Sequence, residues 1–586
     1  MVRRVLIVLL LMMVGMLCVT GRLVYIQILG TENFSKHHIN LIKKAVQQRQ
    51  QQVVLQSGRG DITDRQHHSL IHYDTYALVA FPFAIKSLTP QQLTQVADML
   101  GLSGEQLQNI LREVKEPQVL KHNQRLLELT EQEASTTNEL GINGFIAVPY
   151  QQRFTSEDRL AQHLIGDVGE NSPMIQTEYA KELAQGRLRL DSQVGIMGLE
   201  KTFQPFLLGN GPTTLSYYVD AHGDPIKGMD IKYYGQDNPF YPLSIQTTID
   251  RALQTELEST LNQHGIEEGA AIVLDNRTNE ILAMSSRPVY TPDVFSPVSR
   301  ENKALKRYAP GSVFKIVTAA AALEERIVKP QQMFECDGTL EGTQFHCWKE
   351  EGHGRISFEE AFAQSCNIVF GQLAQQIGPE KLQNYAEKLG LLQLNGWQGS
   401  VYDYHQFKQL DHEEVGQVFA TNRKDDVRHD EAFLRQTGIG QLDVQVTPLA
   451  VANMMATISK GGNKRQVTAV QDILYNTGAH FYDFKQQPLG GDQISPYTAY
   501  RLRQLLARVV THGTASAIHH ERWDVGGKTG TAQISGGRNH QWFAGYYPAT
   551  RPRYSIVVLT LDQPANTQNR SLPIFSDIVD WLYDNR

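Results

Sequence analysis

The sequence predicts a mixed α/β protein in three parts: an N-terminal membrane anchor at residues 1–29, a pedestal region at 30–240 and a larger compact domain at 241–586. Two arginines precede a long uncharged apolar run at the N-terminus, turn-forming residues gather near residue 235, and strand-like and helix-like stretches follow them. The length of 586 residues is enough for several domains. Hydrophobic residues at 41 % and charged residues at 20 % are typical of globular proteins.

Charge and cysteine content exclude several classes of protein. The net charge of −7 is small for this length, and no lysine or arginine run marks a nucleic-acid surface, so we expect no nucleic-acid partner. The four cysteines contain no CxxC pair, which fits neither a disulfide-dense scaffold nor a zinc ribbon.

The anchor is predicted from Val5–Gly21, an uncharged stretch near the lower limit for crossing a bilayer, which Leu23–Leu29 can extend. No small-residue cleavage site follows, so we favour an uncleaved anchor over a cleaved secretory signal. Arg3 and Arg4 should keep the N-terminus in the cytoplasm and place everything after residue 30 outside.

The pedestal region shows structural patterns and no catalytic ones. Val53–Leu55 is a strand candidate. A first amphipathic helix should begin at Thr89 and Pro90, an N-cap followed by a proline at the first helical position. A second should begin at Ser103, which forms a capping box with Gln106. We expect a packed helical hairpin here.

A turn-rich linker at Tyr234–Pro239 leads into the larger domain. Ala270–Leu274 and Glu280–Met284 are predicted to form a β-hairpin. A helix should run from Ser312 to about Glu325, and because it is apolar nearly all round it should be buried. Tyr554–Leu561 should be a central strand, since it alternates too little to be half exposed.

Three short motifs carry the chemistry in this domain. They are Ser312-x-x-Lys315, Ser365-Cys366-Asn367 and Lys528-Thr529-Gly530, in this order. A serine hydroxyl needs a neighbouring base to become a nucleophile, and two residues three apart share one helix face. Lys315 is the one lysine of an apolar helix, so burial should lower its pKa and favour the neutral amine.

The second motif supplies a proton path in this interpretation. Ser365 is a plausible relay of the proton to the leaving group. Asn367 can orient Lys315 and hydrogen-bond a substrate amide.

The third motif indicates an edge strand that faces the substrate. Lys528 would supply positive potential there, and the hydroxyls of Thr529 and Thr531 would meet a carboxylate. Gly530 would let the backbone approach closely.

At these residues the chain resembles the class B penicillin-binding proteins, the monofunctional D,D-transpeptidases of bacterial cell-wall synthesis. The similar segments extend over nearly the whole chain: Arg59–Arg65, His163–Gly166, Gly198–Glu200, Thr248–Asp250, Asp275–Met284, Tyr308–Ser312, Gly526–Gln533 and Trp542–Gly545. The chain departs from the family pattern at Gln66-His67, where Asn-Gly is usual, and at Leu442, where glycine is usual.

The resemblance implies a serine β-lactamase/transpeptidase-like catalytic domain, with a central antiparallel sheet flanked by helices, after an elongated α+β pedestal of the dimerisation type. It implies that Ser312 attacks the D-Ala-D-Ala bond of a peptidoglycan stem peptide and passes the acyl group to the amine of a neighbouring stem. The oxyanion hole would be the backbone N–H groups of Ser312 and Thr531. It implies no cofactor, covalent acylation by β-lactam antibiotics, and a glycosyltransferase partner.

Other functions remain open. A D,D-carboxypeptidase or a β-lactamase would use the same acyl-enzyme, although a β-lactamase needs no anchor or pedestal. A bifunctional synthase with a glycosyltransferase module is disfavoured, because Glu157-Asp158 and His163 do not have the spacing of such modules. A division or sporulation scaffold with a ligand-sensing pocket is the non-enzymatic alternative.

The cysteines raise a separate question. Cys336, His346, Cys347 and His353 cluster in the sequence, but zinc sites usually show tighter paired spacing, so we expect no metal. Cys366 lies between two predicted catalytic residues, and we hypothesise that it forms a disulfide with Cys347 that distorts the motif. The alternatives are that Cys366 is a small buried hydrophobe, or that Cys336 and Cys347 form a loop bridge.

Overall fold

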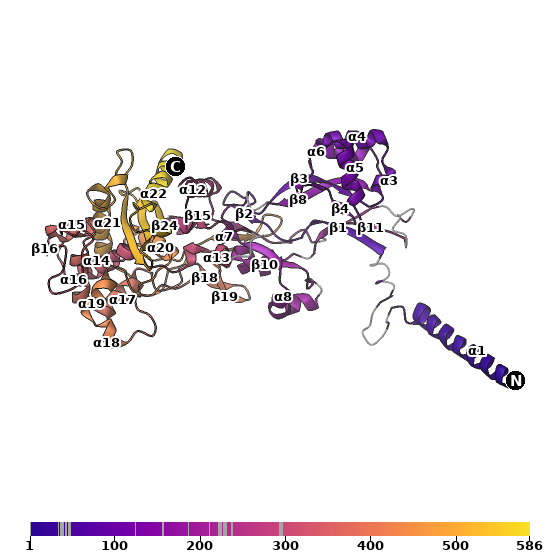
Figure 1. Ribbon diagram of the computed structural model, residues 1–586, viewed down its shortest axis with the longest axis horizontal. Helices are drawn as coiled ribbons and strands as arrows, with labels where there is room; N and C mark the ends of the chain where they lie inside the picture. Colours follow the sequence, from indigo (N-terminus) through magenta and orange to yellow (C-terminus); the bar gives the residue numbers. More distant parts are fainter. Residues whose placement is uncertain are drawn as a thin grey trace. The chain divides into compact units, whose positions relative to one another are not determined.

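The computed structural model describes residues 2–586 except 33, 35–39, 42–43, 45–48, 124, 155–157, 186, 210, 221–225, 227–230, 236–237 and 292–296. Glu157 and the middle of the predicted linker, Gln236 and Asp237, lie outside the described residues. The chain forms two compact units (Figure 1). The smaller comprises Met1–Arg59, Tyr73–Gln152 and Asn210–Asn238, and the larger Gly60–His72, Arg153–Gly209 and Pro239–Arg586. The predicted domain boundaries at 29/30 and 240/241 stay predictions.

The apolar N-terminus is helical, as predicted. Helix α1 spans Val2–Val24 and continues as a π-helical turn, Tyr25–Leu29, so the helix does extend beyond Gly21. Its apolar side chains are exposed. By length and composition, Arg3–Ile28 can cross a membrane.

In the part of the smaller unit that the structure describes, two larger sheets accompany a two-stranded one of β5 (Lys121–His122) and β6 (Arg125–Leu126). β1 (Gln50–Gln56) pairs antiparallel with β11 (Thr213–Tyr218), which pairs with β12 (Lys232–Tyr234). The second sheet is built on β3, with β4, β7 and β8 as its partners. Its strands are β3 (His72–Ala80), β4 (Gln118–Val119), β7 (Glu128–Leu129) and β8 (Phe145–Arg153).

Three capped helices accompany these strands. α4 (Pro90–Met99) and α5 (Gly104–Glu113) begin at Thr89 and Ser103, and both have the capping box predicted from the sequence. α6 (Glu131–Glu139) has a third capping box, which the sequence interpretation missed. The predicted strand at Val53–Leu55 is confirmed within β1.

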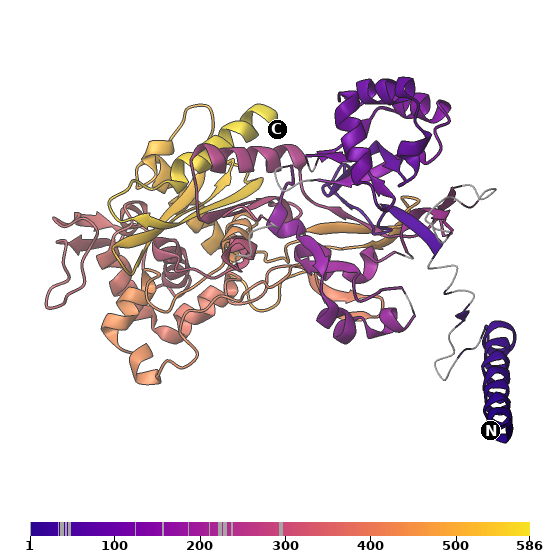
Figure 2. The same cartoon turned by 45° about the vertical axis from the view of Figure 1, so that its right-hand side comes forward.

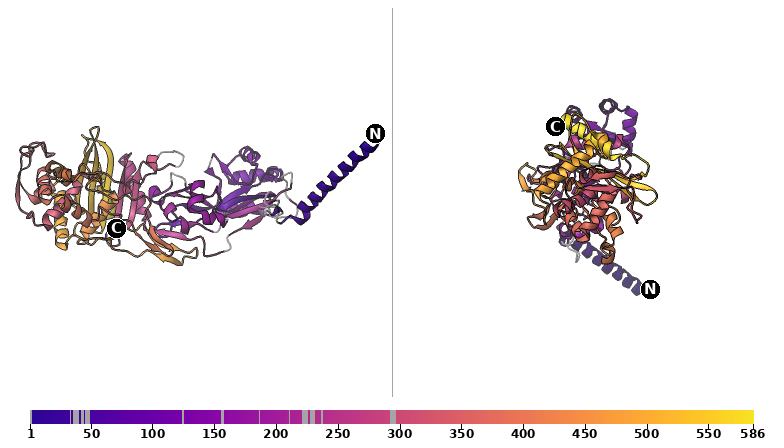
Figure 3. Two further views of the ribbon diagram at one scale, coloured as in Figure 1. Left: turned by 90° about the horizontal axis from the view of Figure 1, so that it is seen from below. Right: turned by 90° about the vertical axis from the view of Figure 1, so that its left-hand side faces the viewer.

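The larger unit is built on a five-stranded antiparallel sheet, which is visible in yellow and magenta in Figures 2 and 3. Its order is β15-β14-β24-β23-β22, so β24 is central and β22 lies at one edge, as predicted. The strands are β14 (Gly269–Asp275), β15 (Glu280–Arg287), β22 (Gly526–Ile534), β23 (Arg538–Tyr547) and β24 (Tyr554–Pro564).

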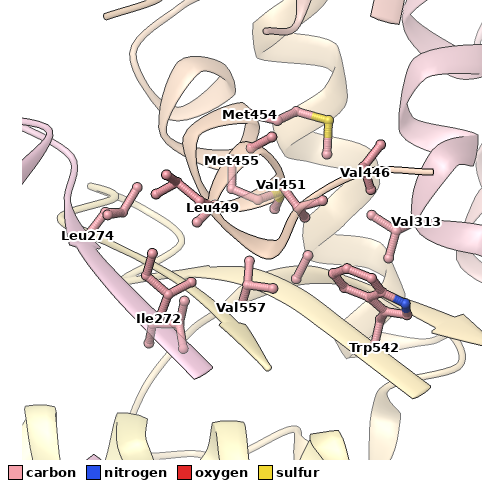
Figure 4. Packing of buried hydrophobic residues seen from close by; sticks show 14 of the residues in the cluster. Ile272, Leu274, Val313, Val446, Leu449, Val451, Met454, Met455, Trp542 and Val557 are labelled. Atoms are coloured by element: carbon pink, nitrogen blue, oxygen red, sulfur yellow. The ribbon is translucent and has the colours of Figure 1, made fainter. Parts of the chain in front are cut away.

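Helix α20 (Pro448–Ser459) packs on β14, β23 and β24, and its buried apolar side chains form the core with residues of those strands. Figure 4 shows Leu449, Val451 and Met454 above Ile272 and Val557. α12 (Arg251–Gln263) and α22 (Ser571–Asn585) also pack against the sheet and each other. Further helices of this unit are α15 (Phe358–Ala363), α16 (Asn367–Ile377), α17 (Pro379–Lys388), α19 (Glu431–Gly438) and α21 (Pro496–Thr511).

A second sheet explains why an N-terminal segment belongs to the larger unit. β2 (Ile62–Thr63) pairs in parallel with β13 (Ser244–Thr247). β13 in turn pairs with β20 (Val470–Leu474), and β20 with β21 (His480–Asp483). The chain thus begins in the smaller unit, contributes Gly60–His72 to the larger one and then goes back to the smaller one at Tyr73.

The helix expected from Ser312 begins differently. A 3₁₀ turn, η3, occupies Gly311–Phe314, and the α-helix α14 spans Lys315–Glu324. Gly311 has φ +51°, and a Cβ atom there would meet the Thr531 carbonyl oxygen at 2.3 Å, so the chain enters the helix through a tight turn against β22. Residues i and i+3 of a 3₁₀ turn eclipse, so Ser312 and Lys315 still share a face. The burial of α14 is confirmed, because Lys315 to Leu323 are all buried.

The contact between β22 and η3 leaves no space for a side chain at Gly530. A Cβ atom at Gly530 would meet the Pro310 carbonyl oxygen at 2.5 Å. We predict that Gly530→Ala lowers the free energy of unfolding by about 1–3 kcal/mol, the range for overpacking, because the strand must move away. Gly490→Ala is the control, since its Cβ meets nothing within 4 Å. Equal chemical-denaturation curves for both variants would contradict the close approach.

Buried His163 makes the larger unit sensitive to acid. In α7 (Gln162–Ile165) its ring Nε2 donates to the Ser299 carbonyl at 2.9 Å, and burial lowers the pKa to about 4. In the unfolded chain His163 has an ordinary histidine pKa, so it is protonated at a higher pH than in the folded protein. Stability should therefore fall as the pH drops from about 6.5 to 4, by up to about 3 kcal/mol.

The matched variant for this prediction is His163→Gln, which cannot be protonated there. The variant should be less stable at pH 7 but should lose less stability between pH 7 and pH 4.5. Thermal unfolding of both proteins across this range measures the difference, and parallel pH profiles would contradict the assignment.

Candidate active site

One cavity of about 630 Å³ joins residues of all three predicted motifs. Ser312, Ser365, Asn367, Thr529 and Thr531 all line it. They come from η3, from the turn before α16 and the first residue of that helix, and from the edge strand β22. Segments more than 200 residues apart in the sequence therefore meet at one place, and Lys315 and Lys528 lie fully buried as parts of the same motifs.

The buried ammonium of Lys315 links the first two motifs. Its Nζ donates to the Ser365 carbonyl oxygen at 2.7 Å, to Ser365 Oγ at 3.2 Å and to Asn367 Oδ1 at 2.8 Å. Burial lowers the pKa of Lys315 to about 8. At pH 7 the side chain is then still mostly ammonium, but about a tenth of it is the neutral amine, which can accept a proton from Ser312 on the same face.

The second motif holds its shape through a strained turn. Ser365 has φ +54°, the left-handed region that non-glycine residues rarely adopt. Asn367 is the first residue of α16, and its Nδ2 donates to the His346 carbonyl oxygen at 3.2 Å. This conformation directs both the main-chain and the side-chain oxygen of Ser365 to Lys315.

The third motif lies on β22 as expected. Lys528 Nζ donates to the Thr529 carbonyl oxygen at 3.3 Å, and the pKa of Lys528 is lowered by burial and by the nearby Lys315. The Thr529 hydroxyl bonds that of Thr514 at 2.7 Å. Both hydroxyls border the cavity, where an anionic group of a ligand would meet them.

Sequence reasoning missed several residues of the cavity. Thr514 follows α21 and Trp348 lies in the loop before α15, and no motif marked either residue. Trp348 is 56 % exposed and donates from Nε1 to the Gln364 carbonyl at 3.0 Å. Gln441, within the family-like segment, donates to the Thr531 carbonyl at 3.4 Å.

The two departures from the family pattern are accommodated in left-handed turns. Leu442, where glycine is usual, has φ +59° and an exposed side chain. His67 has φ +67°. Gly440, two residues before Leu442, keeps its contact with the turn at Gly311. The Gly311 N–H donates to the Gly440 carbonyl at 3.0 Å. The leucine therefore leaves the packing around η3 intact.

Three cysteines and a histidine meet beside the cavity, in a combination that the spacing did not indicate. All four cysteines of the chain are free thiols. The Sγ atoms of Cys336, Cys347 and Cys366 and a ring nitrogen of His353 lie within 4.8 Å of one another. His346, grouped with this loop in the sequence interpretation, instead bonds Thr339 Oγ1 at 2.9 Å. Thiolate and imidazole ligands suit zinc, so these four side chains can hold such an ion.

Comparisons with known proteins agree with this fold. Residues 269–580 match the family described as penicillin binding protein transpeptidase domain, and residues 54–236 match the penicillin-binding protein dimerisation domain. The first match covers more than half of the chain.

Named relatives include stage V sporulation protein D of Bacillus subtilis, which is 31 % identical over 397 residues, 64 % of this chain and 58 % of that protein. Peptidoglycan D,D-transpeptidase MrdA of Acinetobacter baumannii is 25 % identical over 598 residues, 94 % of this chain and 83 % of its own length. The alignment with the sporulation protein thus spans little more than half of that relative.

A solved structure shares the fold over the whole chain. The structure from a peptidoglycan synthase complex that coordinates polymerization and crosslinking superposes with a TM-score of 0.67 at 23 % identity, and covers 100 % of this chain and 99 % of that one. Together with the two matched domains, this places the predicted catalytic sheet and its pedestal in one known architecture. The chain belongs to the class B penicillin-binding proteins, the monofunctional peptidoglycan D,D-transpeptidases.

Proposed function

We propose that this chain cross-links peptidoglycan through an acyl-enzyme on Ser312. The observation that carries the proposal is the set of three hydrogen bonds that hold the buried Lys315 amine between Ser365 and Asn367, on the face shared with Ser312. A serine, a buried amine with a lowered pKa and a second serine are the parts that nucleophilic acyl transfer requires.

The first half-reaction is acylation. Ser312 Oγ attacks the carbonyl carbon between the two terminal D-alanines while the neutral Lys315 amine takes its proton. The backbone N–H groups of Ser312 and Thr531 stabilise the oxyanion. The tetrahedral intermediate collapses as the C–N bond breaks, and the Ser365 hydroxyl relays a proton to the departing D-alanine.

The second half-reaction is transfer. The amine of a neighbouring stem peptide attacks the ester and loses its proton to the neutral Lys315. The ester C–O bond to Ser312 then breaks, and the lysine returns the proton to Ser312 Oγ. Thr529 and Thr514 bind the terminal carboxylate of the first substrate, assisted by the positive potential of Lys528. Water in place of the amine gives D,D-carboxypeptidase activity from the same intermediate, so the two activities share these residues.

The acyl-enzyme is tested with a fluorescent penicillin and intact-protein mass spectrometry. Ser312→Ala should abolish the covalent adduct, while Ser535→Ala, an exposed serine of the β22–β23 turn, should label normally. Lys315→Ala should slow labelling by at least ~10², the lower range for loss of a general base. An adduct that persists in Ser312→Ala, or full-speed labelling of Lys315→Ala, would contradict these roles.

We also propose a single-pass topology, with a cytoplasmic N-terminus and an extracytoplasmic catalytic domain. Arg3 and Arg4 precede the apolar helix, and positive residues stay on the cytoplasmic side. The peptidoglycan stem peptides lie on the other side, as would the polymerising glycosyltransferase that we propose as partner. The synthase complex whose structure shares this fold supports that partner.

A reporter that is active only outside the cytoplasm should be active when fused after residue 40 and inactive when fused before residue 3. N-terminal sequencing of the mature protein should recover the original N-terminus. A soluble chain that begins near residue 22 would establish a cleaved signal instead.

A further inference from the structure

Trp348 presents an exposed indole to the active-site cavity. Of the five tryptophans, all within the part of the chain that the structure describes, it alone is exposed, at 56 %. It lines the cavity that contains Ser312. Acylation and transfer, as formulated from the three motifs, give this side chain no role. An exposed apolar ring beside a reacting group indicates a surface that binds part of a substrate.

Two contacts hold the indole in place. Its Nε1 donates to the Gln364 carbonyl oxygen at 3.0 Å, and its ring meets the ring of His353 edge to face, with centroids 5.6 Å apart. Gln364 directly precedes Ser365, the proposed proton relay. The ring is therefore fixed before a ligand arrives, so binding to it costs little conformational entropy.

The neighbours of Gln364 show which end of the cavity Trp348 borders. The carbonyl oxygen of Ala363 accepts a hydrogen bond from the Thr514 N–H at 3.1 Å. The Thr514 hydroxyl bonds that of Thr529 at 2.7 Å, and these two hydroxyls bind the terminal carboxylate in the proposed reaction. The segment that anchors Trp348 thus adjoins the end of the cavity where the departing D-alanine lies.

The acyl acceptor has to pass through this same end. Transfer is the reverse of acylation with a different amine, so the incoming nitrogen reaches the acyl carbon from the position that the D-alanine nitrogen has left. The chain that carries this nitrogen then extends away from Ser312, through the space beside Thr514 and Thr529. Trp348 borders that space.

The walls of the cavity suit a neutral amine on an aliphatic chain. Among the described residues that line it there is no Asp or Glu. A carboxylate in the wall would favour the protonated amine, which cannot attack an ester. The face of an indole instead offers apolar surface to methylene groups, and it adds no negative charge that would hold the proton.

We propose that the exposed indole of Trp348 is the acceptor subsite, where it binds the aliphatic chain that carries the primary amine of the neighbouring stem peptide. Water has no such chain, so contact with the indole speeds attack by the amine and leaves hydrolysis unaided. Trp348 thereby determines how the acyl-enzyme divides between cross-linking and D,D-carboxypeptidase activity. The inference rests on the proposed function, whose acylation step involves other residues.

The experiment uses the full chain in detergent with an N-acyl-D-alanyl thioester as acyl donor. The acceptors are two soluble stem tripeptides, one with lysine and one with meso-diaminopimelate at the third position. Mass spectrometry measures the transfer product and the hydrolysis product as the acceptor concentration rises. Trp348→Ala should raise the acceptor concentration for half-maximal transfer by about tenfold or more, the lower range for a lost apolar contact in a binding pocket.

Two further variants separate acceptor binding from a structural role. Trp348→Phe keeps an apolar ring but lacks the N–H that bonds Gln364, so it should retain most of the transfer. Tyr497→Ala removes an aromatic ring that is 62 % exposed and lies outside the cavity, and it should behave as the wild type. Penicillin labelling of Ser312 reports acylation separately, and Trp348→Ala should slow it much less than it weakens transfer.

A binding measurement complements the kinetics and needs no truncated side chain at Trp348. Ser312→Ala cannot form an acyl-enzyme, so the acceptor tripeptide can be titrated into it without reaction. The tripeptide that the wild type uses should change the tryptophan fluorescence of this variant. The added substitution Trp348→Phe should remove that change.

An unaltered half-maximal acceptor concentration in Trp348→Ala would overturn the proposal. So would equal slowing of penicillin labelling and transfer in Trp348→Ala and Trp348→Phe, because it would show that the indole only supports the turn at Ser365. Absence of a transfer product with both tripeptides in the wild type, or a fluorescence change that survives Trp348→Phe, would also overturn it. A wild type that neither thioester nor penicillin acylates at Ser312 would instead contradict the proposed function.

Discussion

The active site depends on one buried cation with neutral partners. The three hydrogen bonds of Lys315 Nζ all go to uncharged oxygens, those of Ser365 and Asn367, and no carboxylate contributes to them. Burial favours the neutral amine and outweighs the opposing electrostatic effect of Cys366 and Cys347, so the pKa of Lys315 falls and the lysine can act as a base. The same need for acceptors determines the backbone around it: the left-handed Ser365 turns its carbonyl inward, and α16 begins where Asn367 completes the set.

Close backbone contacts hold the nucleophile in position against this base. η3 is fixed on one side by β22, where Gly311 and Gly530 leave no room for a Cβ atom, and on another by Gly440. Trp542 of the neighbouring strand β23 donates from Nε1 to the Ala309 carbonyl at 2.9 Å, which anchors the approach to the turn. Glycines at the contact points carry no side chain, so main-chain atoms of the two segments can meet directly. Main-chain atoms held in this way have little freedom to move.

Local sequence signals predicted what is locally determined. Capping residues identified α4 and α5. A helix that is apolar nearly all round indicated the burial of α14, and weak alternation of polar and apolar residues indicated the central position of β24. The order of three motifs predicted that Ser312, Ser365, Asn367 and the β22 threonines meet, and all of them line the cavity. The position of Thr514 could not be predicted, because loop closure brings it to the site. For the thiol cluster, the sequence grouped Cys336, Cys347 and His353 and separately paired Cys347 with Cys366, but it did not indicate that all four side chains meet. The sequence interpretation divided the chain into contiguous domains, and such a division could not show that Gly60–His72 belongs to the larger unit. That segment is placed by the parallel pairing of β2 with β13, which lies far away in the sequence.

The position of β22 at the edge of the sheet has a consequence for molecular recognition. An edge strand presents a row of N–H and C=O groups on its outer side, which is a hazard for aggregation in most proteins and is usually blocked. Here that edge runs beside Ser312 and the cavity, so an extended peptide can add to the sheet as a further strand. Main-chain pairing reads the extended conformation and the chirality of a guest more than its side chains. An edge strand in this position is therefore suited to hold an extended peptide in register with Ser312.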